Sequence, residues 1–445
     1  MVNLPTPVAM IAAMRIRPAR RIKGQLRVPG DKSISHRAAL IAALANGTSI
    51  ISNFSPGADC AATIECLAAL GVAIAEKEGN LIVNGVGRQG FKPANAPLDC
   101  GNSGSTMRML AGVLAGQNLT TTLIGDESLS ARPMTRIIEP LQAMGATVRS
   151  HEGKPPLTII GSESLKPIAY GLPVSSAQVK SCVLLAALNA AGVTQISESL
   201  VQSRDHTERM LQWFGASLSL QTLGVTDVVS IEGPANFSGR PVAIPGDISS
   251  AAYFVAAAAL LPNSELLIED VGLNATRTEF LSLFKSLGLS IDLVHTRDES
   301  NEPVGNIRVM VERREIHIQT TLSGAASAQM IDELPLLAVV GTQIRGGIEI
   351  RHAEELRLKE SDRIATTVAN LRAMGAAVKE FDDGLRVEPS ALNGAKIKTG
   401  GDHRIAMAFT VAALFAEGES EIDDAECVRV SFPGFFESLE SIVER

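Results

Sequence analysis

The sequence predicts an α/β protein built from six copies of one βαβ-type unit, arranged as two domains of three units each. Three observations support this prediction. The same order of elements recurs along the chain, each copy contains a helix that is apolar on all sides, and most copies close on an amphipathic helix that ends in glycine. With 445 residues, the chain is long enough for two to four domains, each with its own core.

Each copy begins with a strand, continues through a polar turn and then enters the apolar helix. The six copies start, in order, at VPGDKSISHR (28–37), DCGNSGSTMR (99–108), GLPVSSAQVK (171–180), IPGDISSAAYF (244–254), DELPLLAVVGT (332–342) and GGDHRIAMAF (400–409). A helix that is apolar all round has to be buried on every side. We therefore expect this helix, which follows the polar turn, to form the centre of each unit.

The second helix of a unit is amphipathic and ends in a matching phrase. The phrases are CLAALG (66–71), PLQAMGA (140–146), MLQWFGA (210–216), LFKSLG (283–288), NLRAMGA (370–376) and, without the glycine, FFESLESIVER (435–445). Glycine just after the last apolar position is the usual signal of a helix C-terminus. The polar positions Glu65, Glu139, Glu208 and Arg372 predict that these helices face water on one side.

Composition excludes several classes of protein. The net charge of −8 argues against a general polyanion binder, and only 4% aromatic residues argue against a stacking platform for single-stranded nucleic acid. No apolar run is long enough to span a membrane. The five cysteines form no C-x-x-C pair, which indicates a reduced intracellular chain without a zinc ribbon or a disulfide framework.

The N-terminal segment has its basic residues after a short apolar run, the reverse of the order in a signal peptide. We interpret residues 1–20 as a loose extension, with Met14 as a possible internal start.

The polar turns precede the buried helices, and helix N-termini attract anions through unpaired N–H groups and the helix dipole. Residues suited to anions occur at several of these turns: Lys32, Ser33, Arg37, Asn102, Gly104 and Arg404, with Arg132 and the charged run 354–363 between turns. Each turn alone is equally consistent with helix capping or a solvated loop. Their recurrence at equivalent places favours one site for small anions between the two domains.

Nine segments together resemble the signature segments of the 5-enolpyruvylshikimate-3-phosphate (EPSP) synthase family, the 3-phosphoshikimate 1-carboxyvinyltransferases. They are GDKSISHRA, LDCGNSGSTMR, GDESLSARPM, SSAQVKS, SRDHTERM, PGDISSAA, IDELPLLAV, EELRLKESDRI and GGDHRIAMAF. The resemblance implies the enolpyruvyl transferase fold, with three βαβαββ units per domain. It implies an N-terminal domain of residues 28–243, a C-terminal domain of 1–27 plus 244–445, and a two-strand hinge near 26–30 and 240–245.

The resemblance also implies an activity. Family members transfer the enolpyruvyl group of phosphoenolpyruvate to the 5-hydroxyl of shikimate 3-phosphate and release phosphate, by addition and elimination through a tetrahedral intermediate. This reaction belongs to the shikimate pathway of aromatic amino acid and chorismate biosynthesis, and its enzyme is the target of glyphosate. The implied protein is a cytoplasmic monomer that binds these small molecules, uses no cofactor or metal, and has no nucleic-acid or membrane partner.

Residue roles follow from the same resemblance. The implied catalytic residues are Asp332, which takes the proton of the 5-hydroxyl, Glu360, which protonates the methylene carbon, and Lys32. The residues implied to bind shikimate 3-phosphate are Lys32, Ser33, Arg37, Ser175, Ser176, Gln178, Ser203, Arg204, Asp332 and Lys359. Those implied to bind phosphoenolpyruvate are Lys32, Asn102, Gly104, Arg132, Gln178, Arg363 and Arg404.

The chemistry of this reaction explains why such residues are needed. Phosphoenolpyruvate carries a carboxylate and a phosphate, so fixed cations have to offset its charge. The 5-hydroxyl needs a base, and the methylene carbon needs an acid. We therefore expect the surroundings of Asp332 and Glu360 to push their pKa values apart, so that one is ionised and the other protonated.

The sequence departs from the family pattern at a few positions. Val430 stands where many members have a lysine that contacts phosphoenolpyruvate, Glu355 stands where many have asparagine, and Ala177 replaces a polar residue. Gly104 lacks the methyl group that would crowd the phosphonate of glyphosate, so we expect ordinary glyphosate sensitivity.

Two alternative functions are considered. Enolpyruvyl transferases that act on UDP-N-acetylglucosamine share the six-unit fold but use a loop cysteine, and residues 126–134 contain none. A non-catalytic anion-binding protein on the same repeats would be expected to lose Asp332, Glu360 or the arginines, and this chain has them all.

Overall fold

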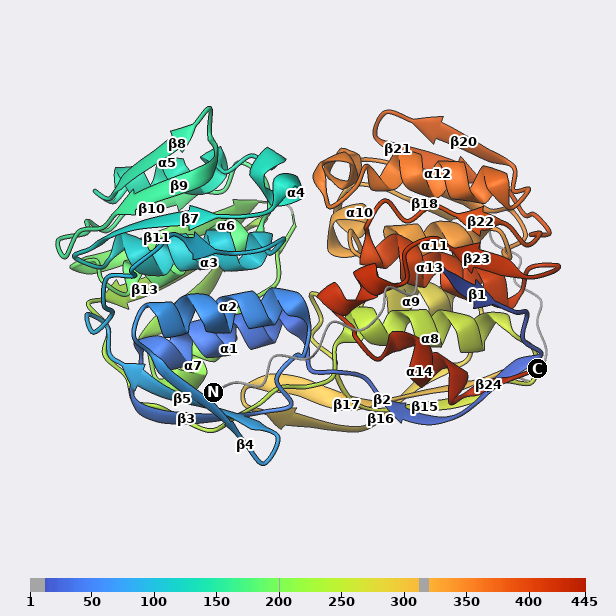
Figure 1. Cartoon of the computed structure of the whole chain (residues 1–445), viewed down its shortest axis with the longest axis horizontal. Helices are drawn as coiled ribbons and strands as arrows, with labels where there is room; N and C mark the ends of the chain where they lie inside the picture. The colour runs from blue at the N-terminus through green and yellow to red at the C-terminus, as the bar shows by residue number, and fades with distance from the viewer. Residues whose placement is uncertain (1–12, 200, 312–319) are drawn as a thin grey trace.

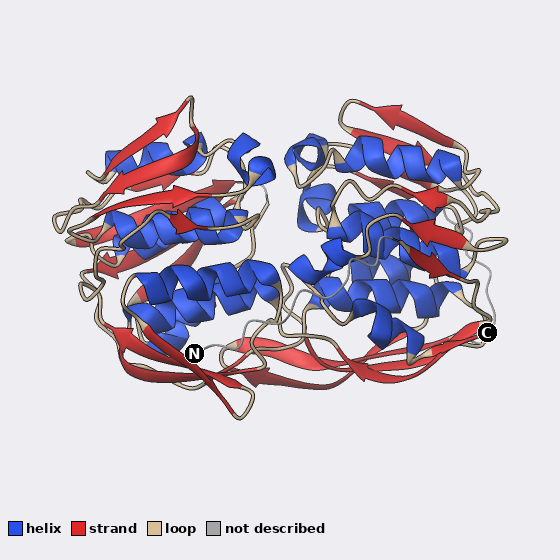
Figure 2. Ribbon diagram, viewed as in Figure 1, coloured by secondary structure: helices blue, strands red, loops and turns tan. Residues whose placement is uncertain are grey.

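The computed structural model describes residues 13–199, 201–311 and 320–445. Figures 1 and 2 show two halves side by side, joined along one edge by long strands. The first three units lie in one half and the last three in the other. Helices in both halves run roughly along the long axis of the molecule (Figure 1).

Three sheets of the first half share one strand order, in which a first strand runs parallel to a second and an antiparallel hairpin follows. The first sheet contains β14 (Val242–Ala243), β3 (Asn46–Ser52), β5 (Asn80–Val86) and β4 (Ala73–Lys77). The second contains β6 (Leu98–Asp99), β7 (Thr120–Ile124), β9 (Lys154–Ile160) and β8 (Thr147–His151). The third contains β10 (Ala169–Gly171), β11 (Gly192–Ser199), β13 (Thr226–Gly233) and β12 (Leu218–Leu223).

The second half repeats this order with variations. The fourth sheet contains β16 (Ile291–Glu299), β17 (Glu302–Met310), β15 (Glu265–Gly272), β2 (Arg21–Arg27) and β24 (Val443–Glu444). The fifth contains β18 (Thr320–Leu322), β19 (Ile348–Ile350), β21 (Gly384–Val387) and β20 (Val378–Phe381). The sixth contains β1 (Met14–Ile16), β23 (Ser420–Ile422) and β22 (Lys396–Ile397), with β1 antiparallel to β23.

Strand β1 corrects the interpretation of residues 1–20 as a loose extension. Met14 pairs with Ile422, and the side chain of Ile16 is buried in the core of the second half. The N–H of Ala19 donates to the carbonyl of Leu414 at 2.7 Å. Residues 13–20 are therefore an integral part of this half, while residues 1–12 lie outside the described residues.

The central helices of the six units are buried as predicted. They are α1 (Lys32–Leu44), α3 (Gly104–Ala115), α6 (Ala177–Ala187), α8 (Ile248–Leu260), α11 (Leu334–Gly341) and α13 (His403–Leu414). Every residue of α8, α11 and α13 is buried. Several of these helices begin earlier than expected, because Asp31, Ser103, Asp247 and Asp402 cap them and draw the polar turns into the first helical turn.

The amphipathic helices lie outside the central ones. They are α2 (Ala58–Ala69), α5 (Thr135–Ala143), α7 (His206–Phe214), α9 (Glu279–Ser286), α12 (Arg363–Ala373) and α14 (Phe435–Glu440). Short elements are α4 (Glu127–Ala131), α10 (Ala325–Gln329) and the 3₁₀ helices η1 (Glu354–Leu358) and η2 (Glu426–Val430). The predicted terminal glycines Gly71, Gly145, Gly215, Gly288 and Gly375 all have φ between 81° and 104°, where glycine is favoured.

Glu208 on α7 is an exception to the predicted water-facing side of these helices. It is buried, whereas Glu65, Glu139 and Arg372 are exposed. The cause is Lys180 of α6, whose ammonium lies 2.7 Å from Glu208 and so offsets its charge inside the protein.

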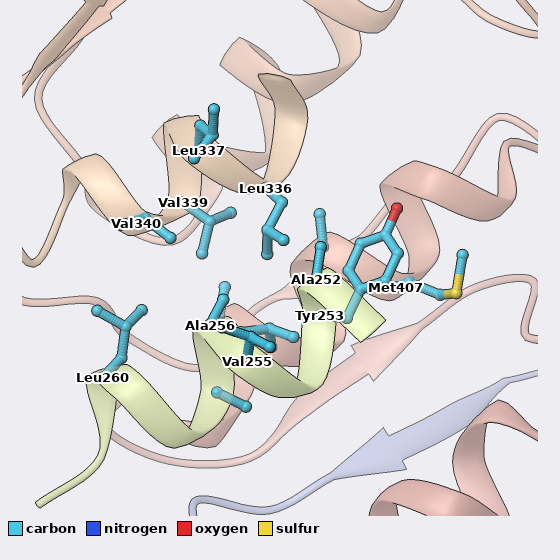
Figure 3. Close-up of a cluster of buried hydrophobic side chains, with 14 of the residues drawn as sticks. Ala252, Tyr253, Val255, Ala256, Leu260, Leu336, Leu337, Val339, Val340 and Met407 are labelled. Carbon is cyan, nitrogen blue, oxygen red and sulfur yellow. The ribbon is translucent and has the colours of Figure 1, made fainter. Parts of the chain in front are cut away.

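Two separate hydrophobic cores fill the two halves. One draws on residues 34–244, and the other on residues 16–28 and 248–442. Figure 3 shows part of the second core, where Ala252 and Ala256 of α8 approach Leu336 and Val339 of α11. We propose that each core corresponds to one domain, with boundaries as expected from the sequence. In the described part of the chain, no helix combines the length and apolarity that a membrane crossing requires.

Candidate active site

Several of the candidate site residues lie where the two halves contact each other. Lys32 opens α1 of the first half, and its backbone N–H donates to the carboxylate of Asp247, which caps α8 of the second half, at 3.2 Å. Arg204, just before α7, forms an ion pair with Asp332, just before α11. The N-terminal ends of central helices from both halves therefore lie close together, which places their polar residues in one region.

Asp332 is surrounded by cations from both halves. Its carboxylate contacts Arg204, lies 3.3 Å from Nη2 of Arg404, and lies 3.7 Å from Nη1 of Arg363. Burial alone would raise the pKa of Asp332, but Arg404, Arg204, Lys359 and Arg363 together hold it well below its usual range. Asp332 is therefore a carboxylate at neutral pH, the form that a base requires.

Glu360 lies on the other side of Arg363. The Nη2 of Arg363 donates to Glu360 at 2.6 Å, and its Nε donates to Asp402 at 2.7 Å. Burial would raise the pKa of Glu360, but Arg363, the largest opposing influence, together with Arg132 and Lys32 holds it well below its usual range.

The expectation that the surroundings push the two pKa values apart is thus wrong. Asp332 and Glu360 both have lowered pKa values, and both are ionised at neutral pH. The physical reason is the cluster of buried guanidinium groups around them, which stabilises these two carboxylates in their charged form.

Two lysines complete this group. Nζ of Lys32 lies 2.9 Å from Asp59, and although burial acts in the opposite direction, Asp59 raises the pKa of Lys32. Burial lowers the pKa of Lys359, which contributes positive charge near Asp332. Lys32 is therefore firmly cationic, whereas Lys359 loses its proton more easily than an exposed lysine.

A second group lies at the start of α3. The amide of Asn102 accepts a hydrogen bond from Arg132 at 2.7 Å and donates one to Asp126 at 2.7 Å. Gly104 is the first residue of α3, and a Cβ there would lie 2.7 Å from Nη1 of Arg108 and 3.5 Å from Nη1 of Arg132. Glycine at this place therefore leaves room beside two guanidinium groups.

Gln178 of α6 joins this second group through Arg108. Its amide oxygen accepts a hydrogen bond from Arg108 at 2.7 Å, and its amide nitrogen donates to Ser105 at 2.8 Å. The structure thus brings together four of the residues that the resemblance assigned to phosphoenolpyruvate, namely Asn102, Gly104, Arg132 and Gln178.

The remaining predicted residues line the first half around α1 and α6. Arg37 is buried, and its guanidinium donates to the carbonyl of Ser33 at 2.8 Å and to the hydroxyls of Thr207 and Ser181 at 2.6 and 2.8 Å. Burial lowers the pKa of Arg37 to about 10. These three partners belong to the first half, so Arg37 connects α1 to α6 and α7. Ser33 also accepts a hydrogen bond from Arg204 at 3.4 Å.

The serines predicted to contact phosphate lie on two neighbouring loops. Ser175 donates to Glu198 at 3.2 Å and to the carbonyl of Val201 at 2.6 Å. Ser176 caps α6 without a side-chain cap bond, and the buried hydroxyl of Ser203 has no hydrogen-bond partner in the described chain. The hydroxyl of Ser203 is therefore free to form a hydrogen bond with a ligand.

The departures from the family pattern also have definite places. Val430 ends η2, and its carbonyl lies 2.6 Å from where a Cβ of Gly57 would be, so η2 packs directly against the start of α2. Glu355 lies 3.4 Å from Arg136 and so links the two halves through an exposed ion pair. Ala177 is the first residue of α6.

Sequence reasoning did not single out Asp59, Arg108 or His403. Arg108 and His403 lie inside segments that carry the resemblance, so their motifs could have found them. Asp59 carries no such signal and is identified only by its ion pair with Lys32. Burial lowers the pKa of His403 to about 3, which leaves its imidazole neutral.

The arrangement is suited to a small, highly charged anion. Guanidinium and ammonium groups from both halves are fixed in place by hydrogen bonds, so they need little reorganisation to stabilise negative charge. Asp332 supplies a base among them. Within the described residues, no group of three or more His, Cys, Asp or Glu side chains is placed to hold a metal ion.

Comparisons with known proteins match one family. A family model described as EPSP synthase (3-phosphoshikimate 1-carboxyvinyltransferase) matches residues 16–439. A 3-phosphoshikimate 1-carboxyvinyltransferase from Koribacter versatilis is 49% identical over 97% of this chain and 100% of its own length. A protein of the same name from Desulforamulus reducens is 46% identical over 96% of this chain and 99% of its own.

Solved structures agree with this match. An EPSP synthase from Acinetobacter baumannii has a TM-score of 0.84 at 38% identity, with 96% of this chain and 98% of that chain covered. The enolpyruvyl transferase NikO from Streptomyces tendae has a TM-score of 0.77 at 18% identity, covering 97% of both chains, and so shares the fold.

The ionised state of Asp332 can be tested through stability. Because its folded pKa lies below the unfolded value of about 3.9, the carboxylate stabilises the protein above that pH and loses this effect as pH falls through the folded pKa. Asp332→Asn should lower the unfolding free energy by about 3 kcal/mol, by the same amount at pH 7 and pH 5. Urea unfolding measures this, with the exposed Asp292→Asn as the control. A loss that shrinks already between pH 7 and pH 5 would contradict the lowered pKa.

Proposed function

The chain belongs to the EPSP synthase family, and on that premise we propose that it transfers the enolpyruvyl group of phosphoenolpyruvate to the 5-hydroxyl of shikimate 3-phosphate. Inorganic phosphate is released, and the product serves aromatic amino acid biosynthesis. The observation that carries this proposal is the convergence of Arg204, Arg363 and Arg404 from two halves of the chain on Asp332. That cluster combines anion binding with a base.

The proposed roles divide between the halves. In the first half, Asn102, Gly104, Arg132 and Gln178 contact phosphoenolpyruvate, helped by Arg363 and Arg404 from the second half, as the resemblance implies. Shikimate 3-phosphate lies against Ser33, Arg37, Ser175, Ser176, Gln178, Ser203, Arg204, Asp332 and Lys359. Lys32 contacts both substrates. Hydrogen bonds hold Arg204 to Asp332, Arg132 to Asn102 and Arg363 to Glu360. These bonds fix the orientation of the three guanidinium groups, which supports a shared binding site for the substrates.

The reaction proceeds by addition and elimination. Asp332 takes the proton of the 5-hydroxyl as its oxygen attacks C2 of phosphoenolpyruvate, while Glu360 gives a proton to C3. Glu360 then takes a proton back from C3 as the bond between C2 and the phosphate oxygen breaks, which regenerates the double bond. The leaving phosphate takes the proton that Asp332 removed from the hydroxyl.

Glu360 must gain a proton before it can act as the acid, although the cations around it lower its pKa. We propose that phosphoenolpyruvate supplies the change. Its two anionic groups compete for Arg363 and Arg132, the cations that hold Glu360 ionised, and add negative charge beside it. Both effects raise the pKa of a carboxyl group.

We further propose that the protein acts as a cytoplasmic monomer on these two small molecules. The five cysteines are all buried and unbridged, which fits a reducing compartment.

The activity is tested by phosphate release. Phosphoenolpyruvate with shikimate 3-phosphate should give stoichiometric phosphate and a new enol ether, while phosphoenolpyruvate with UDP-N-acetylglucosamine should give neither. We expect no reaction with the UDP-sugar because residues 126–134 lack the loop cysteine that transferases acting on it use. Release with the UDP-sugar alone, or with neither acceptor, would overturn the proposal.

The acid and base are tested by isosteric variants. Asp332→Asn and Glu360→Gln should each lower kcat by about 10²–10⁴-fold, because each removes one proton transfer from the reaction. Isothermal titration should still detect shikimate 3-phosphate binding to both variants. The exposed Glu65→Gln should retain full turnover. Near-normal kcat in either site variant would show that its assigned role is wrong.

Inhibition by glyphosate tests whether the inhibitor binds beside Gly104. A methyl group there would press on the guanidinium of Arg108, 2.7 Å away, and on the space beside Arg132. Gly104→Ala should therefore raise the inhibition constant of glyphosate on the order of tenfold or more, a cost of ~1.4 kcal/mol, while the KM for phosphoenolpyruvate rises less. Gly434→Ala, whose new methyl group meets open space, is the matched control. Equal increases in both constants would place the glyphosate contact elsewhere.

A further inference from the structure

The two segments that cross between the halves carry the same short sequence, and the structure pairs them. They read VPGD (28–31) and IPGD (244–247). Gly30 and Gly246 form an antiparallel bridge. The aspartate N–H of each segment donates to the proline carbonyl of the other, at 2.8 and 2.9 Å. This hinge contact is therefore pseudo-symmetric, and one strand leads into α1 while the other leads into α8.

Both aspartates of this contact also start a helix. Asp31 accepts a hydrogen bond from the N–H of Ile34 at 2.9 Å, and Asp247 accepts one from the N–H of Ser249 at 2.8 Å. Asp247 reaches across the hinge as well, to the N–H of Lys32. Two buried carboxylates, one from each half, thus lie close enough to repel each other, and the proximity of Asp31 adds to the effect of burial in raising the pKa of Asp247.

Arg277 forms ion pairs with the carboxylates of both Asp31 and Asp247. It lies between β15 and α9, with its side chain buried, and its Nη1 is 3.1 Å from Asp31 while its Nη2 is 3.4 Å from Asp247. Nη2 also donates to the hydroxyl of Ser249 at 2.8 Å, and that hydroxyl contacts Glu333, the neighbour of the proposed base. One side chain therefore connects the start of α1, the start of α8 and the start of α11.

A second row of buried groups extends this connection between the halves. Nδ1 of His206 on α7 lies 2.8 Å from Glu302 on β17. Asn274 donates to Glu302 at 3.1 Å and to Asp205 at 2.6 Å. The remaining ring nitrogen of His206 lies 3.4 Å from Nη1 of Arg277. The charge of Arg277 is thus embedded in a polar network that water does not reach, where an unpaired carboxylate is costly.

We propose that Arg277 is a positioning residue for enolpyruvyl transfer, which holds the starts of α1 and α8 in register by neutralising the paired aspartates of the hinge. In that register Lys32 of α1 and Asp332 beside α11 face the same substrates. The kinetic part of this proposal rests on the proposed function. The geometric part, the relative placement of the two halves, does not.

The test combines a charge deletion with its compensation. Arg277→Gln leaves two buried carboxylates without their cation, and kcat for phosphate release should fall about 10- to 100-fold while the KM values change less than about threefold. Adding Asp31→Asn removes one carboxylate and keeps the helix cap, because asparagine caps as well as aspartate. The double variant should regain about tenfold in kcat. Arg308→Gln, which removes an exposed arginine of the same sheet, should match the unchanged protein.

Small-angle X-ray scattering of the same variants supplies a readout independent of activity. The radius of gyration should increase in Arg277→Gln, as the halves lose their fixed placement, and return toward the unchanged value in the double variant. If the unchanged protein releases no phosphate, the proposed function fails and scattering alone decides the role of Arg277.

Two results would overturn the proposal. One is a folded Arg277→Gln variant with unchanged kcat and unchanged radius of gyration. The other is a double variant no better than Arg277→Gln in both measurements. Should Arg277→Gln fail to fold, Arg277→Lys takes its place. Lysine keeps the charge but lacks the two guanidinium nitrogens that contact Asp31 and Asp247 separately. A full kcat and an unchanged radius of gyration in that variant would equally contradict the proposal.

Discussion

The burial of the central helices is the constraint from which the rest of the structure follows. Helices α8, α11 and α13 expose none of their residues, so their sides can carry only apolar packing. Their N-terminal turns are different, because the unpaired N–H groups there need polar partners. The N-terminal ends of central helices from the two halves lie close together, so polar residues of several units gather between the two cores.

The region between the halves contains several buried arginine and lysine side chains, and carboxylates of the protein form ion pairs with them. Asp332, Glu360 and Asp402 hold Arg363 from three directions, and Asp59 holds Lys32. These pairs keep the cations oriented, and they also keep the proposed acid ionised. A doubly anionic substrate that competes for the same cations would both bind and change the protonation of its catalyst, which links recognition to chemistry.

Local patterns predicted the repeat well, because the small apolar helices and their closing glycines need only neighbouring residues to be recognised. Long-range partners decided the features that were missed. Met14–Ile16 becomes a strand because it pairs with Ser420–Ile422, more than 400 residues away. Glu208 is buried because Lys180 lies beside it. The site residues were assigned by resemblance, and their shared environment, including the lowered pKa of Glu360, depends on charges from both halves that no local pattern contains.

The VPGD and IPGD segments pair with each other, and Arg277 lies between their aspartates. On our proposal, this contact sets how the two cores are placed, and with them the charged side chains that bind the substrates. The most direct measurement is a crystal structure of the protein with shikimate 3-phosphate and glyphosate bound. We expect both ligands between the halves, with shikimate 3-phosphate against Ser175 and Asp332 and glyphosate against Arg132 and Arg404. Ligands that contact only one half, or that leave the Arg204–Asp332 region empty, would contradict a site shared by the two domains.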